Sequence, residues 1–361
     1  MQTHYYYTKL NKAQQAVYYA LLDGLTSLAS SFSVPRIAQK ELFEIHFLLR
    51  LDHPELFWSE GISYRYYEQA ASVEVVPDYL FDKKKVKTHQ QAMAARLEKL
   101  TRPAMQLSEM EKLQYVHDFI CRQVQYDKLK KQYSHEIIGP LGQGIGVCEG
   151  IAKTVKALCD ALGIWCIIAV SEANREKQIK YRHAWNIVRV GGQYYHLDAT
   201  FDNSLSGQAD IRYDYFLLAD SQIFRDHEPV VWPVPACADH DNFYYRQKKL
   251  SFTKVEEVQK RAAQAVRKGK PLTFHWRGGA LSREVAKNLL EVVQQEAAAK
   301  GKHSCVSLNA SQAVFSIVFE DGTAVQSVQE QQVSADGEAM QTADAPVCSQ
   351  HDAESRQQED I

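Results

Sequence analysis

Cys148 stands where the sequence predicts the start of a helix, directly after a glycine-rich loop at residues 141–146. After it, apolar residues recur at helical spacing as far as Leu162, and Gly163 then supplies a stop. The free backbone N–H groups and the positive dipole end at such a position favour the thiolate, the nucleophilic form of cysteine. The same N–H groups can hold an oxyanion. We therefore expect Cys148 to be a nucleophile, whereas Cys159, in mid-helix, should be buried and inert.

A histidine and an aspartate follow on what the sequence predicts to be one β-hairpin. Residues 181–190 form its first arm, two glycines its turn, and residues 193–201 its second arm. The two-residue turn sets a register that places His183 and Asp198 on one face of adjacent strands. A carboxylate that holds one nitrogen of an imidazole turns the other toward a nucleophile, which is what a general base requires. The predicted cross-strand pairs are Val190 with Gln193, Trp185 with Asp198, and His183 with Thr200.

Two alternatives involve His196. The same register places His196 on this face, so it is the rival base, but its predicted cross-strand partner, Ile187, carries no charge, and His196 ranks second. A metal site made of His183, His196 and Asp198 is the other alternative. A cysteine at a helix end favours thiol chemistry instead, and we predict neither a metal nor a cofactor.

Three blocks of sequence carry a family resemblance. They read G-V-C-E-G-I-A-K at residues 146–153, H-A-W-N-I-V at 183–188 and Y-H-L-D-A-T-F-D at 195–202. In this order they resemble the bacterial transglutaminase-like superfamily, over about residues 107–227. The resemblance implies a papain-like core in which the helix that carries the cysteine packs on an antiparallel sheet. It also implies a catalytic triad, with Cys148 as nucleophile, His183 as base and Asp198 as the residue that orients the base.

A side chain that supports the oxyanion is less clearly marked. Papain-like enzymes place a glutamine upstream of the cysteine, and Gln143 lies five residues before Cys148. We predict Gln143 as this donor, with an ordinary loop residue as the alternative.

The reaction implied is acyl transfer at an amide carbonyl through a thioester on Cys148. Water as the acyl acceptor makes a peptidase or amidase, and a primary amine makes a transglutaminase that crosslinks protein glutamines. The expected partners are a protein or peptide substrate and an amine acceptor. The alternative is an interaction module that has this fold without its chemistry, and the intact triad argues against it.

Composition bears on the remaining classes of function. The 361 residues carry a net charge of −2, which gives no support to a nucleic-acid binder. No apolar run has the length of a membrane span, and the start of the chain does not resemble a signal peptide. The seven cysteines are scattered without a Cys-x-x-Cys pair, so neither a disulfide framework nor a structural zinc site is expected. We predict a cytoplasmic protein.

The predicted fold class is α+β, in five parts. Residues 1–105 form a mostly helical N-terminal region and residues 106–228 the papain-like core. Residues 229–250, rich in proline and acidic side chains, are predicted as a linker to a small α/β domain at 251–328. The remainder, 329–361, is a glutamine-rich tail with eight acidic residues against one arginine, and we predict it to be disordered.

Local patterns predict several elements inside these parts. A strand pair is expected around 64–67 and 73–76, and Ser108 with Glu111 forms a capping box that starts a helix. The elements predicted in the small domain are a helix (255–266), a strand (271–276), a second helix (282–299) and one or two closing strands (303–308 and 313–319).

Overall fold

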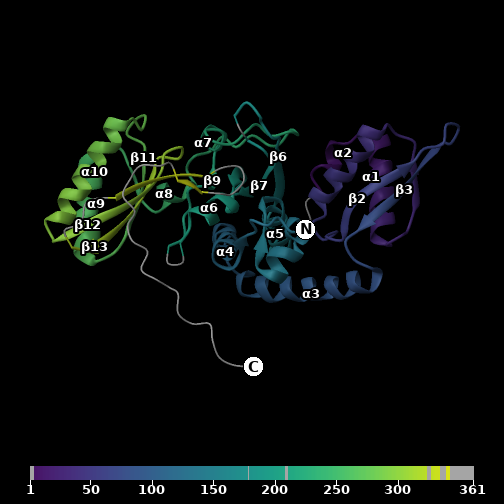
Figure 1. The fold of residues 1–361 in the computed structure, drawn as a ribbon, viewed down its shortest axis with the longest axis horizontal. Coiled ribbons are helices and arrows are strands. Elements are labelled where there is room, and N and C mark those ends of the chain that lie inside the picture. Colours follow the sequence, from purple (N-terminus) through teal and green to yellow (C-terminus); the bar gives the residue numbers. More distant parts are fainter. Residues whose placement is uncertain (1–3, 178, 208–209, 323–326, 334–338, 342–361) are drawn as a thin grey trace, which may run out of the picture. The chain divides into compact units, whose positions relative to one another are not determined.

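The structure is a computed structural model that describes residues 4–177, 179–207, 210–322, 327–333 and 339–341, with side chains as far as Gly322. The chain forms two compact units (Figure 1). The first comprises the residues up to Tyr244, and the second comprises most of the residues after it. The predicted triad lies entirely within the first unit.

The N-terminal part of the first unit combines three helices with a small antiparallel sheet, in the strand order β1-β3-β2. The predicted strand pair corresponds to the end of β2 and the middle of β3, although Tyr66 and Tyr67 lie beyond β2. The first strand of this sheet has only four residues, too few to show an alternating pattern, so it could not be predicted from the sequence. The elements are η1 (Tyr7–Lys9), α1 (Lys12–Thr26), β1 (Phe32–Pro35), α2 (Gln39–Asp52), β2 (Ser59–Arg65), β3 (Ser72–Tyr79), α3 (Lys83–Thr101) and η2 (Arg102–Ala104).

A four-stranded antiparallel sheet, in the order β6-β7-β8-β9, forms the centre of the rest of this unit, and α5 packs on it. The helix α4 begins after the predicted capping box of Ser108 and Glu111. In Figure 1 the long helix α3 runs beside α4 and α5. The elements are α4 (Glu109–Gln123), β4 (Gln125–Tyr126), η3 (Gln132–His135), η4 (Gly139–Gln143), β5 (Ile145–Gly146), α5 (Cys148–Ala161), β6 (Cys166–Ser171), β7 (His183–Val190), β8 (Gln193–Leu197), α6 (Ala199–Leu205), β9 (Phe216–Leu218) and α7 (Asp220–Ile223).

The N-terminal part and this sheet share one hydrophobic core. Leu48 and Leu51 of α2 pack with Ile168 of β6 and Ala152 of α5. The buried Tyr6 belongs to the same cluster and donates its hydroxyl to the Ile168 carbonyl (2.5 Å). The regions predicted as 1–105 and 106–228 are therefore parts of one unit, because apolar side chains of α2 pack on the same face of the sheet as α5.

The segment predicted as a linker, 229–250, is packed rather than extended. Val231 donates its N–H to the Val170 carbonyl (2.8 Å), which extends the edge of β6. Cys237 is fully buried against Ile167 and Trp185. Proline and acidic side chains indicated an open connection, but the apolar residues between them contribute to the core. The segment also contains α8 (Tyr244–Gln247).

The second unit has helices α9 and α10 packed together beside a mixed sheet, in the strand order β10-β11-β13-β12-β14-β15 (Figure 1). Its core contains Val258 and Leu289 from the two helices and Phe274 and Phe315 from the sheet. The predicted helices and strands of this unit agree with the observed ones to within two residues. The elements are β10 (Ser251–Phe252), α9 (Val255–Lys268), β11 (Leu272–Trp276), α10 (Arg283–Ala298), β12 (Lys302–Asn309), β13 (Val314–Asp321), β14 (Ser327–Val333) and β15 (Ala339–Gln341).

The predicted disordered tail begins, in the structure, inside a strand. Residues 329–333 belong to β14, which pairs in parallel with β12, and 339–341 form β15. Backbone pairing at a sheet edge does not need the apolar side chains whose scarcity suggested disorder. The prediction for 334–338 and 342–361 lies outside the described residues. In the part of the chain that the structure describes, no helix has both the length and the apolar character to cross a membrane.

Candidate active site

Cys148 is the first residue of α5, as the sequence predicts. Val147 precedes the helix in extended conformation and donates its N–H to the Ser134 carbonyl (3.0 Å). Residue 150 must be glycine, because a Cβ at Gly150 would collide with the same carbonyl. The half-buried thiol therefore lies at the N-terminal end of a helix that the core holds in place. The predicted apolar stripe is buried throughout: Val147, Ile151, Val155, Leu158 and Leu162.

Cys159 lies on the same helix as Cys148 but in a different environment. It is fully buried, and the neighbouring Cys166 thiol together with burial raises the pKa of Cys159 well above its usual value. A thiol of this kind stays protonated and inaccessible, in agreement with the prediction for it.

The hairpin places His183 at the start of β7, and β7 pairs with β8 in the predicted register as far as Leu197. The second arm ends there, four residues earlier than predicted, and the strand pairs expected beyond it do not form. The reason is Asp198, whose Oδ1 accepts the N–H groups of Thr200 (2.8 Å) and Phe201 (3.1 Å). It therefore caps α6 instead of continuing the strand.

The contact between His183 and Asp198 is nevertheless present. Nε2 of His183 lies 2.6 Å from Oδ2 of Asp198, and both side chains are buried. Nδ1 of His183 has no hydrogen-bond partner in the described structure. Burial opposes the protonation of His183, but the Asp198 carboxylate and, after it, the Cys148 thiol outweigh burial and raise its pKa to about 10. The structure thus brings the three predicted residues together, with the carboxylate on one imidazole nitrogen.

Asn186, which belongs to the H-A-W-N-I-V block, fixes the strand of the histidine against the helix of the cysteine. Its Nδ2 is within hydrogen-bonding distance of the Ala152 carbonyl in α5 (3.0 Å) and of the Ile167 carbonyl in β6 (3.3 Å). A buried side-chain amide that joins three elements holds their relative positions tightly. The sequence analysis did not single out this residue.

Aromatic rings enclose the imidazole of His183. The Trp185 ring stacks on it with centroids 5.7 Å apart and planes 18° apart, and Phe201 lies at 4.8 Å. These rings keep the histidine in a dry environment, where its contact with the carboxylate is stronger than in water.

His227 is the polar neighbour of the triad that sequence reasoning missed. Its Nε2 lies 2.9 Å from Oδ2 of Asp198, the same oxygen that bonds His183. Its Nδ1 lies 2.9 Å from Oδ1 of Asp226, and the imidazole of His227 is almost fully buried. The only signal in the sequence was the resemblance around residues 214–227, because the contact joins positions 29 apart through irregular chain.

The rival histidine, His196, has a different environment. It pairs with Ile187 as predicted, and its Nδ1 accepts the Trp185 ring N–H (2.9 Å). Its Nε2 bonds Oδ1 of Asp220 (2.8 Å), a carboxylate that the hairpin register could not reveal because it comes from α7. With both nitrogens engaged, His196 has none left for the Cys148 thiol.

Three groups of ligand-type side chains lie close enough to hold a metal, counting only the described residues. The predicted alternative trio is not one of them, because His196 is grouped with Asp220 and Cys237. In that group Nδ1 of His196 accepts a hydrogen bond, so its proton is on Nε2, the atom that would have to bind the metal. In the group of His183, Asp198 and His227, the ligand atoms already bond one another.

Gln143, the predicted oxyanion donor, is exposed and ends the short π-helical turn η4. No hydrogen bond joins Gln143 to Cys148 or His183 within the described residues, so its role stays a prediction.

A buried charge network supports the start of α5. Glu149, next to the nucleophile, bonds Lys153 (2.8 Å) and lies 3.7 Å from Arg50 of α2. Glu136 pairs with both of these cations. Burial opposes the ionisation of Glu149, but Lys153 and its other partners keep its pKa below the usual range. Two acids and two bases thus balance, and no net charge is left beside Cys148.

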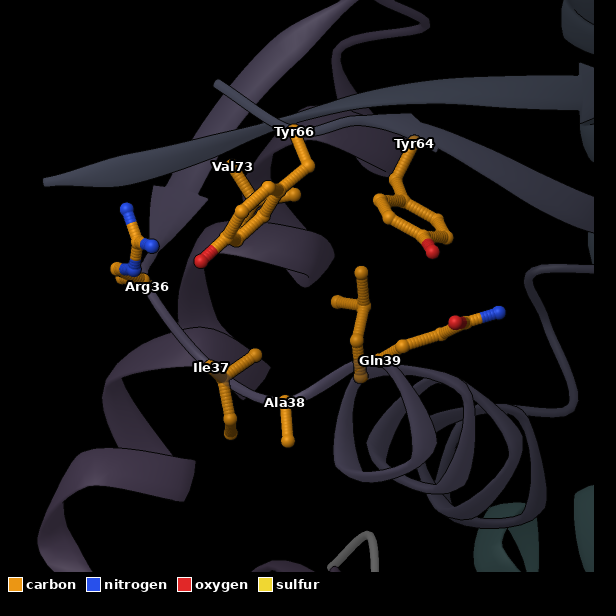
Figure 2. Close-up of a pocket in the computed structure, with 8 residues that line it drawn as sticks. Arg36, Ile37, Ala38, Gln39, Tyr64, Tyr66 and Val73 are labelled. Atoms are coloured by element: carbon orange, nitrogen blue, oxygen red, sulfur yellow. The ribbon is translucent and has the colours of Figure 1, made fainter. Parts of the chain in front are cut away.

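A separate groove of about 560 Å³ lies between the β2–β3 hairpin and the start of α2. Figure 2 shows Tyr64 and Tyr66 on one side of it and Ile37 and Ala38 on the other. No cysteine, histidine or carboxylate lines this groove, so it holds no nucleophile and no acid–base pair.

A helix that begins with a cysteine and packs on an antiparallel sheet carrying a histidine defines an α+β fold of the papain-like type. Residues 94–199 match the model of the transglutaminase-like superfamily, and this core of the chain belongs to that superfamily. The match includes Cys148, His183 and Asp198, whereas His227 lies beyond it.

Two solved structures show distant similarity to this chain. A crystal structure described as a TGase is 12% identical over 39% of this chain and 44% of its own, with a TM-score of 0.28. A candidate cysteine protease from Cytophaga hutchinsonii is 14% identical over 38% of this chain and 61% of its own, with a TM-score of 0.26. The chain thus covers less than two thirds of either one. No curated protein matches the sequence.

Proposed function

We propose that this protein is a thiol enzyme that transfers an acyl group from an amide to water or to a primary amine. Cys148 is the nucleophile, His183 the acid–base residue, and Asp198 the residue that orients it. The observation that carries the proposal is the different environment of the two ring nitrogens of His183. Its Nε2 bonds Asp198, its Nδ1 has no hydrogen-bond partner in the described structure, and the Cys148 thiol is close enough to help raise the pKa of His183.

The first half-reaction would form a thioester. The Cys148 thiolate attacks the amide carbonyl, and the negative oxygen of the tetrahedral intermediate is held by backbone N–H groups at the start of α5. Nδ1 of His183 then gives its proton to the departing amine or ammonia, and the C–N bond breaks. Asp198 stabilises the imidazolium before this step and holds the neutral imidazole in the same orientation after it.

The second half-reaction would release the acyl group. Nδ1 of His183 takes a proton from the incoming water or amine, which attacks the thioester carbonyl, and the Cys148 thiolate leaves. Water gives a carboxylic acid, which is the outcome of a peptidase, amidase or deamidase. A lysine or another primary amine gives a new amide, which is the outcome of a crosslinking transglutaminase. The substrates that fit are peptides or proteins with an accessible carboxamide or peptide bond.

Product analysis of the purified chain tests this proposal. Glutamine-containing peptides are incubated with and without a fluorescent primary amine, and free ammonia, new peptide termini and amine incorporation are measured. We expect release by the wild type and none above background by Cys148→Ala. Cys121→Ala is the matched control, since Cys121 is also half-buried in the first unit. Equal release by wild type and Cys148→Ala would refute the enzyme and leave the idle interaction module.

A further inference from the structure

His227 lies in irregular chain after α7 and is almost fully buried, yet both of its ring nitrogens bond carboxylates. Nε2 meets Asp198 at 2.9 Å, and Nδ1 meets Asp226 at 2.9 Å. A neutral imidazole carries only one N–H, whereas an ionised carboxylate can only accept. If both carboxylates are ionised, both nitrogens must carry protons, and His227 is a cation.

The four donors around Asp198 require this carboxylate to be ionised, and a proton shared between Asp226 and His227 lies on the imidazole, the stronger base. Asp198 accepts at Oδ1 from two backbone N–H groups at the start of α6, and at Oδ2 it meets His183 and His227. Asp226 accepts the Tyr215 hydroxyl at Oδ2 (2.6 Å) as well as the His227 proton at Oδ1. Burial opposes the charge on His227, but its bonds to Asp198 and Asp226 raise its pKa.

We infer that His227 is a positioning residue of the triad: a permanently protonated imidazole that holds Asp198 ionised and turned toward His183. This inference rests on the proposed function for its meaning in catalysis. The structural part of the inference does not depend on the proposed function, because four hydrogen-bond donors leave Asp198 no freedom to rotate away from His183.

The charge of His227 also sets how tightly His183 holds its proton. The two imidazole rings lie 5.3 Å apart, so a permanent cation on one disfavours a proton on the other. Without His227, the full negative charge of Asp198 would act on His183 alone. The proton of His183, which must pass to the leaving amine, would then be held too tightly. The ionisable groups that face these two rings are Cys148 from α5, Asp198 at the start of α6, Asp226, Tyr215 before β9, and His196 from β8.

Two variants separate the charge of His227 from its hydrogen bond. His227→Gln keeps a donor toward Asp198 and removes the charge. Asp226→Asn keeps the imidazole of His227 and its bond to Asp198. It removes the carboxylate that requires Nδ1 of His227 to carry a proton. His46→Gln is the matched control, because His46 is equally buried in the first unit but bonds Ser59 (3.1 Å) instead of a triad residue.

The readouts are kcat, KM and the rate of Cys148 alkylation by iodoacetamide as a function of pH. For His227→Gln we expect kcat to fall about tenfold or more with KM within about twofold, since His227 does not touch substrate. The alkaline limb of the kcat profile and the pH dependence of alkylation should both move upward by roughly one pH unit or more, because a neighbouring positive charge is gone. Asp226→Asn should give a smaller shift in the same direction, and His46→Gln should shift neither. A fall in kcat with an unmoved pH profile would show a merely structural histidine and overturn the inference.

Failure of the inference and failure of the proposed function are distinguishable. Alkylation reports the proton of the Cys148–His183 pair without any substrate, so it remains informative if no amide is turned over. If His227→Gln does not fold, ¹⁵N spectra of histidine-labelled wild type decide the matter. Besides His183 and His117, whose pKa values are also raised, we expect a third buried histidine with both ring nitrogens protonated at pH 8, and its signal should be lost in Asp226→Asn. A neutral His227 would overturn the inference.

Discussion

Two clusters of a cysteine, a histidine and an aspartate share the short helix α6. The Cys148 cluster comprises Cys148, His183 and Asp198, and the Cys121 cluster comprises Cys121, His117 and Asp202. Asp198 caps α6, and Asp202 lies one turn further along it. In both clusters the histidine and the aspartate are buried and the cysteine is half-buried. By residue types alone, either cluster could be a thiol active site.

The clusters differ in how the histidine uses its two nitrogens. In the Cys121 cluster, Nε2 of His117 meets both Asp202 (3.0 Å) and the Cys121 thiol (3.7 Å), while Nδ1 lies 3.4 Å from Asp118. A single nitrogen cannot hold the carboxylate and relay a proton to the thiol at once. In the Cys148 cluster, Nε2 of His183 bonds Asp198, and Nδ1 has no hydrogen-bond partner among the described residues. Under the proposed function, this arrangement alone leaves a nitrogen free to exchange a proton with the thiol.

The cysteines also lie at opposite helix ends. Cys148 is the first residue of α5, where the dipole and free N–H groups stabilise a thiolate. Cys121 lies in the last turn of α4, where the negative end of the dipole opposes one. The direction of its hydrogen bonds and the helix end it occupies thus distinguish the Cys148 cluster from the Cys121 cluster. Four experiments test this distinction.

The largest effect should come from removing each sulfur. We expect Cys148→Ser to lower kcat/KM by about a thousandfold or more, because the oxygen nucleophile is not activated by this pair. Cys121→Ser should stay within about twofold of wild type, since its histidine offers no proton path. Amide turnover at a single substrate concentration below KM measures both. Comparable losses in the two variants would contradict the distinction.

The next effect concerns the reactivity of the two thiols in the folded wild type. Both side chains are half-buried, so exposure alone does not rank them. We expect iodoacetamide at pH 7 to modify Cys148 roughly ten to a hundred times faster than Cys121, because only Cys148 has a helix N-terminus beside it. Site-resolved mass spectrometry over a time course gives the two rates. The same reaction in urea is the control, where the rates should converge; a persisting difference there would trace the ranking to local sequence.

The sequence could predict one of these clusters and not the other. The apolar stripe after Cys148 and the two-glycine turn before Gln193 are local patterns, so the helix start and the hairpin register as far as Leu197 were accessible. The cap at Asp198 was less accessible, because alternating residues continue past it as they would in a strand. The contact between His117 and Asp202 joins residues 85 apart across two helices, and no local period encodes it.

His227 and the packed segment after it show the same limit. Asp198 meets His227 through a loop whose path depends on the whole unit, and Cys237 is buried by residues of the distant strand β6. Composition indicated an open linker there, since it records how many prolines and acids occur and not where the apolar residues between them point. In the second unit α9, α10, β11, β12 and β13 were predicted well because each has a clear period of its own, whereas β10, β14 and β15 were not predicted.

The third predicted effect is on the stability of the fold, and it should be similar for the two clusters. The folded pKa of His183, about 10, lies above its ordinary value of 6.5. Protonation of His183 therefore stabilises the fold fully below about pH 6.5, and this contribution is lost as pH rises through about 10. The pKa of His117 is raised too, because Cys121, Asp118 and Asp202 outweigh burial. A buried cationic histidine therefore does not distinguish the Cys148 cluster from the Cys121 cluster.

Urea unfolding at several pH values measures this effect. We expect His183→Gln and His117→Gln each to be less stable than wild type at pH 6, with the difference shrinking toward pH 10. Only His183→Gln should lose activity where it is still folded. A stability difference that stays constant over this pH range, or grows, would show that the histidine is neutral in the folded protein.

The smallest effect should come from the start of α4, the helix that carries Cys121 and His117. Oγ of Ser108 accepts the Glu111 N–H (3.4 Å), and the Glu111 carboxylate accepts the Ser108 N–H (3.0 Å), which closes a reciprocal cap. We expect Ser108→Ala to cost about 1 kcal/mol of unfolding free energy, because one helix N–H loses its partner. Ser108→Thr keeps the acceptor and should be close to wild type. Since α4 bears no part of the Cys148 cluster, kcat/KM of folded Ser108→Ala should not change, as urea unfolding and turnover at one temperature would show. A tenfold loss of turnover with this small loss of stability would mean that the Cys121 cluster takes part in catalysis.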